Sequence, residues 1–161
     1  MDLHALYSSH IDDADRLLTR LGVRHEVVQN DTLCLEVPSD ERYSQLLAEL
    51  VTHGRLISES EVNGRLIAVV ELAEPLAAGG WQVSFVELPQ PKRGTEGEGV
   101  RHLQFVTRTG IESFRARFPD LGFDDRGNTM NRLLEIATPE ATLRFHDKSM
   151  GAVIELEQQS S

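Results

Sequence analysis

The 161-residue sequence is poor in cysteine, in lysine and in long apolar runs. Its only cysteine is Cys34, which excludes an internal disulfide framework and is typical of the reducing cytoplasm. No apolar run approaches the ~20 residues of a membrane-spanning helix. The N-terminus also lacks the basic and apolar regions of a secretory signal, so we expect a cytoplasmic protein with no membrane partner.

Positive charge is scarce as well. Lys and Arg total 16 against 26 Asp and Glu, which gives a formal net charge of -10, and the only lysines are Lys92 and Lys148. Binding to the phosphate backbone of nucleic acids requires clustered positive charge, so we expect no nucleic-acid partner. The apolar fraction of 40% is that of a globular protein, and the length predicts one domain over residues 1–161.

Apolar residues spaced by three and four predict helices in the N-terminal part of the chain, residues 1–30. Ser9 is a residue that can cap a second helix within this segment, and Gly22 is a helix end signal. We expect these N-terminal helices to pack on the outside of the domain. A dimerisation arm is the alternative.

The same order of elements is predicted twice after this segment. Residues 31–90 read as a strand, a helix and three further strands, with a two-residue hairpin turn at Asn63-Gly64. A linker rich in proline and glycine follows, and the same order begins again over residues 99–157. The repeat favours an α+β fold in which two curled sheets meet to enclose a cup. A plain α+β sandwich without an internal repeat is the alternative.

Three stretches carry more specific information: GWQVSFVELP at 80–89, EGVRHLQFV at 98–106 and LRFHDKSM at 143–150. They resemble the YecM family, within the vicinal oxygen chelate (glyoxalase/bleomycin-resistance) superfamily. The resemblance implies paired βαβββ modules, with a divalent metal in the cup that chelates vicinal oxygens of a substrate. Its ligands typically come from the first and fourth strands of each module.

The sequence departs from the family pattern in the first strand. Thr32 stands where the family has a histidine, and a neutral hydroxyl is a poor replacement for imidazole at a transition metal. Three outcomes follow: the site binds metal weakly, Cys34 or Glu36 on the same strand substitutes, or the metal is lost.

His102, His146 and Glu87 are the predicted metal ligands. His102 lies on the polar side of its strand, and His146 lies at the end of the fourth strand of the second module. Glu87, which is also the predicted catalytic carboxylate, ends the equivalent strand of the first module. Simple alternation places it on the same face as Val83 and Phe85, so it reaches the cup only if the cup face carries those apolar groups or if a bulge shifts the strand register.

Two further residues are predicted to bind substrate. Gln82 would line the cup if Glu87 does not. Arg144, like Arg101, flanks a histidine, and its guanidinium group suits a carboxylate.

The leading hypothesis is therefore a metal-dependent enzyme of the vicinal oxygen chelate type, with zinc, iron or manganese as its cofactor. Its partner would be a small oxygenated molecule, and the reaction an isomerisation, a lyase reaction or a dioxygenase-like reaction. The rival is a non-catalytic module that binds a small ligand or serves a structural role. The sequence leaves the substrate and the oligomeric state open.

The charge balance generates a first prediction. We expect no measurable affinity for DNA or RNA at physiological salt, because the net charge of -10 repels the phosphate backbone. Fluorescence anisotropy with labelled oligonucleotides checks this, and a micromolar, salt-dependent affinity would contradict it.

Overall fold

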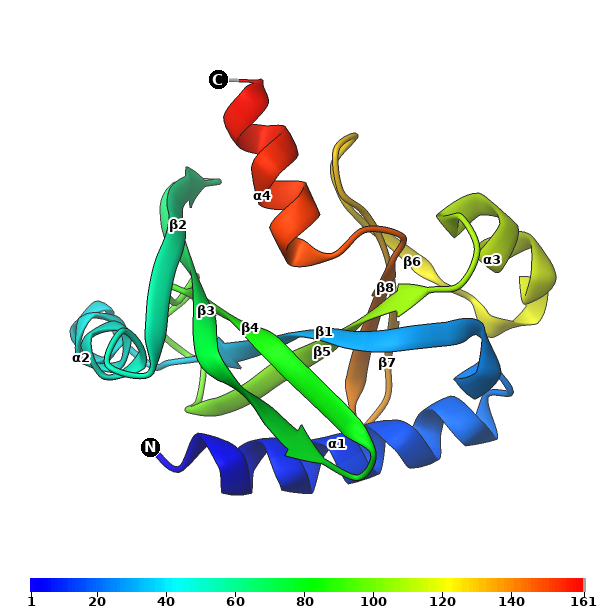
Figure 1. The fold of residues 1–161 in the computed structure, drawn as a ribbon, viewed down its shortest axis with the longest axis horizontal. Coiled ribbons are helices and arrows are strands. Elements are labelled where there is room, and N and C mark those ends of the chain that lie inside the picture. The colour runs from blue at the N-terminus through cyan, green and yellow to red at the C-terminus, as the bar shows by residue number, and fades with distance from the viewer. Residues whose placement is uncertain (161) are drawn as a thin grey trace.

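Eight strands form one mixed sheet in the order β2-β3-β4-β1-β5-β8-β7-β6 (Figure 1). The computed structural model describes residues 1–160. The strands are β1 (Val27–Glu36), β2 (Gly54–Val62), β3 (Arg65–Ala78), β4 (Trp81–Pro89), β5 (Gly99–Thr107), β6 (Asp124–Gly127), β7 (Arg132–Ala137) and β8 (Thr142–His146).

The predicted repeat of βαβββ modules is confirmed. The first module consists of β1, α2 (Asp40–Leu50), β2, β3 and β4, and the second consists of β5, α3 (Ile111–Arg117), β6, β7 and β8. Counted outward from the centre, each half of the sheet runs first, fourth, third and second strand. The first and fourth strands pair parallel in both modules, and β1 pairs antiparallel with β5. The modules therefore meet edge to edge within a single sheet, and do not form two separate ones.

The N-terminal segment is one continuous helix, α1 (Leu3–Arg20), capped by Asp2. The expectation of a second helix that begins at Ser9 is wrong. A stripe of buried apolar side chains, including Tyr7, Ile11 and Leu18, runs past Ser9 and holds the helix against the sheet. Short turns of 3-10 helix lie at Arg24–Glu26 and Pro119–Leu121. Among the described residues, no helix is long and apolar enough to cross a membrane.

The C-terminal tail forms a further helix, α4 (Met150–Gln159), which lies on the opposite face of the sheet from α1 (Figure 1). The strands of the two modules rise on either side of it, and we call this concave face the cup. Met150 and Ile154 of α4 pack there in a small apolar cluster with Val69, Ile57 and Phe85. Helix α4 therefore covers part of the cup on the side of the first module.

Strand β4 changes face partway along its length. Val83 and Val86 both belong to the main core, although regular alternation would place residues three apart on opposite faces. The pairing of β4 with β3 is irregular between Glu71 and Leu76, where β3 contains extra residues. A bulge therefore turns Phe85 away from the main core and toward the cup, where it joins the α4 cluster.

Helix α1 is tied to the middle of the sheet by a buried hydrogen-bond chain. The Tyr7 hydroxyl donates to Asn30 Oδ1 at 2.8 Å, and Asn30 Nδ2 donates to the backbone oxygen of Gln104 at 2.8 Å. The chain links the helix to both central strands, β1 and β5. It orders the backbone on which the candidate site is built.

This chain generates a second prediction. We expect Tyr7→Phe to lower the free energy of unfolding by about 1–2 kcal/mol, because Asn30 would lose a buried partner. The matched control in the same helix is Thr19→Ala, which removes an exposed hydroxyl bonded to its own helix and should cost less than ~0.5 kcal/mol. Urea denaturation measures both values. Equal effects of the two substitutions would contradict the role of the chain.

Candidate metal centre

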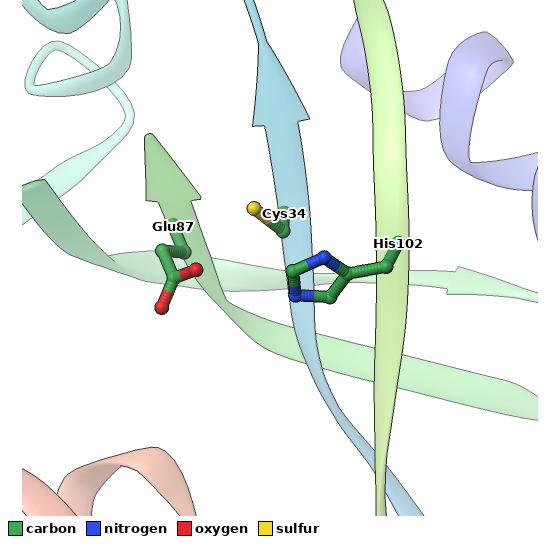
Figure 2. Close-up of side chains that lie close together, drawn as sticks. All are labelled: Cys34, Glu87 and His102. Atoms are coloured by element: carbon green, nitrogen blue, oxygen red, sulfur yellow. The ribbon is translucent and has the colours of Figure 1, made fainter. Parts of the chain in front are cut away.

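Cys34, Glu87 and His102 lie side by side across three neighbouring strands. Cys34 of β1 is the register partner of Glu87 in β4 and of His102 in β5. Directly opposed residues place their side chains on the same face of a sheet. Figure 2 shows the three side chains gathered in front of their strands. One potential ligand atom from each lies within 4.8 Å of the others.

Irregular strands create this alignment. The β4 irregularity lies before Phe85, so it turns both Phe85 and Glu87 toward the cup, and a bulge was one of the two arrangements that would let Glu87 reach it. The pairing of β1 with β5 also shifts next to the site: Cys34 faces His102, but Leu35 faces Val100. Arg101 is therefore an extra residue on β5 immediately beside His102.

The Cys34 thiol is held in its neutral form. Its side chain is 1% exposed, and burial raises its pKa well above the ordinary value of 9.0. The negative charge of Glu87 raises the pKa further, because a thiolate beside a carboxylate is electrostatically unfavourable. A metal ion placed between the two groups would remove that repulsion and take up the thiolate.

His102 is a neutral imidazole with one unused nitrogen. It is 2% exposed, and burial, followed by the charge of Arg144, lowers its pKa well below 6.5. Its Nε2 lies 3.1 Å from Gln104 Oε1, so this pairing assigns the proton to Nε2. Nδ1 is buried and has no hydrogen-bond partner among the described residues. Such a bare lone pair is the state in which histidine binds a metal.

The three donors fit a divalent transition metal. Zinc is bound by thiolate, imidazole and carboxylate ligands, and its catalytic sites combine three protein ligands with one open position. The thiol favours zinc over the hard cations calcium and magnesium, which prefer oxygen. Cys34 thus stands where a substitute for the missing family histidine was expected on β1. Thr32 lies two residues before Cys34 on β1, opposite Phe85, and its hydroxyl donates to Asp31 Oδ2 at 3.0 Å.

His146 does not join this group, so the expected convergence of His102, His146 and Glu87 is wrong. Strand β8 pairs with β5 so that His146 faces Val106, four residues beyond His102. At ~3.3 Å per residue, that offset is about 13 Å. His146 is fully buried, with Nδ1 3.2 Å from Asn131 Oδ1 and Nε2 3.0 Å from Asp31 Oδ2. The Nε2 contact has ion-pair distance but not hydrogen-bond geometry.

The two predicted substrate-binding residues lie apart from each other. Arg144 is half-buried, and its Nε donates to Glu135 Oε2 at 2.7 Å. Its charge acts on His102, but its guanidinium group already has a carboxylate partner. Gln82 is exposed and pairs with Ala77, on the far side of the β4 bulge from Glu87.

A cavity of about 990 Å³ lies between the start of α1 and the β2–β3 hairpin, and none of the three donors lines it. A cavity of about 460 Å³ lies closer to the donors, between β1, β5 and the linker before β5. It is lined by Arg101 and by Glu36, two residues beyond Cys34 on β1. This second cavity is connected to the candidate centre through Arg101, which directly precedes His102 on β5.

The structure also identifies Gln104, which sequence reasoning missed as a site residue. It lies two residues after His102 on the same face, and alternation along the strand would have revealed it. Its Oε1 accepts from His102, and its Nε2 is buried without a partner among the described residues.

Comparison with known proteins agrees with this fold. A methylmalonyl-CoA epimerase from Streptomyces coelicolor, solved with 2-nitronate-propionyl-CoA, superposes with a TM-score of 0.51 at 17% identity. The match covers 76% of this chain and 99% of that one. A protein solved by structural genomics superposes with a TM-score of 0.74 at 27% identity, covering 92% of this chain and 87% of the other. The paired modules and their curled sheet are the vicinal oxygen chelate fold.

Sequence comparison then gives the particular family. The sequence model of the YecM protein family matches residues 1–128, so the chain belongs to the YecM family. Protein YecM of Escherichia coli is 27% identical over 162 aligned positions, which cover 89% of this chain and 86% of that protein. An uncharacterised protein of Haemophilus influenzae is 36% identical over 77 positions, covering 47% of this chain and 40% of that protein.

The environment of Cys34 generates a third prediction. We expect the thiol of the native, metal-free protein to react with a disulfide reagent at pH 8 at least ~100-fold more slowly than in urea, because it is buried and protonated. Since folding raises the thiol pKa, stability should also decline as the pH rises above ~8.5, where the unfolded thiol ionises. Equal labelling rates in buffer and in urea would contradict the burial of Cys34.

Proposed function

We propose that this protein binds a divalent transition metal, with zinc the best match, through Cys34, Glu87 and His102, and acts on a small oxygenated substrate. The observation that carries the proposal is the convergence of a thiol, a carboxylate and an imidazole within 4.8 Å. Cys34 and His102 are both nearly inaccessible to solvent. Burial of polar groups is unfavourable when they have no binding partner, so their burial supports a bound ligand.

The bound metal would act as a Lewis acid on a substrate oxygen. Glu87 is the least buried of the three donors and lies on the cup side of β4, so it is the one that a substrate could approach. Either it completes the metal site or it serves as the general base. In both roles it has to face the substrate.

The structural neighbours support a substrate of this class. Epimerases of the same fold were solved with methylmalonyl-CoA and with 2-nitronate-propionyl-CoA, which are small oxygenated acyl groups on a carrier. We infer an isomerase, lyase or oxygenase reaction in which negative charge develops on a substrate oxygen. Arg144 and Gln82 are retained as proposed substrate contacts, with Arg144 the nearer to His102.

A non-catalytic ligand-binding module is the second candidate, and one observation favours it. Thr32 stands where the family resemblance implies a histidine, and without metal Cys34 keeps its proton, so the site has fewer ready ligands than that resemblance implies. We also infer a cytoplasmic location, because a reducing compartment keeps the single thiol free.

The proposal generates a fourth prediction. Protein purified without a histidine tag is expected to bind one zinc ion, measured by competition with a chromophoric chelator. Cys34→Ala, Glu87→Gln and His102→Gln should each weaken zinc binding by ~100-fold or more, because even residues that only support metal ligands typically contribute 10- to 100-fold.

Two histidine variants serve as controls. His53→Gln changes an exposed histidine, and His146→Gln changes the histidine that the sequence had suggested as a ligand. Both should keep the wild-type zinc affinity, provided that thermal melts show them folded. Wild-type affinity in all three donor variants would overturn the proposed centre.

A further inference from the structure

The Arg101 guanidinium has no protein partner. Within residues 1–160 it forms no ion pair and no hydrogen bond, although it is half-buried. It acts electrostatically on Cys34, His102 and Arg65, so its charge lies beside the candidate metal centre. By contrast, Arg144 is paired with Glu135. A half-buried guanidinium without a carboxylate has lost part of its hydration and gained no ion pair in exchange.

Arg65 is a second cation in the same place. It begins β3, on the same side of the strand as Ile67 and Val69, and Val69 is the register partner of Glu87. Its Nη1 donates to the backbone oxygen of Gln90 at 3.0 Å, and within residues 1–160 it forms no ion pair with a carboxylate. Burial, followed by the like charge of Arg101, lowers the pKa of Arg65, while the charges of Glu96 and Glu87 act in the opposite direction.

The adjoining cavity is rich in positive charge. Arg101 shares the lining of this space of about 460 Å³ with Lys92, Arg93, Glu36 and Glu96. The Glu96 carboxylate is occupied within its own loop, where it accepts from the backbone nitrogens of Lys92 at 2.7 Å and of Arg93 and Thr95 at 3.1 Å. These bonds lower its pKa to about 2. Glu96 therefore stays ionised, and with Glu36 it gives the lining two carboxylates against three basic side chains.

A concentration of basic residues is unusual in this chain, which has a formal net charge of -10 and only 16 Lys and Arg. Many of the other arginines are paired with carboxylates, for example Arg20 with Glu140 and Arg55 with Glu71. A cleft whose charge is opposite to that of the rest of the surface attracts ligands of the opposite sign. Guanidinium groups bind carboxylates through two parallel hydrogen bonds, a geometry that ammonium groups cannot supply.

We propose that Arg101 and Arg65 bind a carboxylate of the substrate, so that the substrate class is a small carboxylic acid with a second oxygen directed at the Cys34–Glu87–His102 group. Only one part of this inference rests on the proposed function, namely that the second oxygen of the substrate is directed at the metal centre. The carboxylate anchor itself depends on the two arginines.

Malonate is the probe. Titration of the zinc-loaded full-length protein, followed by NMR of the arginine Nε–H groups, should show saturable binding at Arg101 and Arg65. Arg101→Gln and Arg65→Gln should each weaken malonate binding by ~10-fold or more, since each removes a charge-assisted contact. The matched control is Arg55→Gln, which removes one exposed arginine on β2 and should leave the affinity unchanged.

The outcomes separate this inference from the zinc proposal. If Arg101→Gln and Arg65→Gln keep wild-type zinc affinity and lose malonate, the anchor is supported. If zinc binds but malonate does not, or binds equally in all variants, the anchor is wrong and the metal centre stands. If zinc does not bind, arginine-dependent binding of malonate to the metal-free protein still supports the anchor, and its absence overturns it. Inorganic phosphate that binds more tightly than malonate would overturn the assignment to a carboxylate.

Discussion

The antiparallel pairing of β1 with β5 is the contact on which both the fold and the candidate site depend. It joins two four-stranded halves that would otherwise each expose a central strand edge. The same register sets Cys34 opposite His102, while the parallel pairing of β1 with β4 sets Cys34 opposite Glu87. Because side chains alternate between faces, a slip of one residue at this seam would place Cys34 and His102 on opposite faces of the sheet. The buried chain from Tyr7 through Asn30 to Gln104 holds the seam from the other face.

The concave side of this seam is unusually polar for a protein interior. His102, Gln104 and Thr32 are buried there, and polar atoms of the first two have no partner within the described residues. Burial of such groups is unfavourable unless they are satisfied, so a surface of this kind is expected where a ligand completes the bonding. The charge pattern points the same way. The neutral thiol and the neutral imidazole can bind a cation. The two guanidinium groups beside them, which form no ion pair within the described residues, can bind an anion.

Local patterns in the sequence predicted most of the architecture, and pairing between distant strands decided what they missed. Alternation and the Asn63-Gly64 turn revealed the strands and their repeat, because both signals lie within a few residues. The capping signal of Ser9 was also local, but the buried stripe of α1 overrode it. At the site, sequence identified Glu87 and His102 as candidates and named Cys34 only as a possible substitute. Nothing in the sequence fixes the offset of β8 against β5, which places His146 opposite Val106 and away from the other donors.

The central claim is that one thiolate, one imidazole and one carboxylate of this chain bind the same metal ion. X-ray absorption at the zinc edge of the zinc-loaded protein tests it most directly, since sulfur scatters differently from nitrogen and oxygen. The account predicts one sulfur neighbour at about 2.3 Å together with nitrogen and oxygen neighbours at about 2.0–2.2 Å. A spectrum fitted by nitrogen and oxygen alone would contradict it, because Cys34 would then not be a ligand.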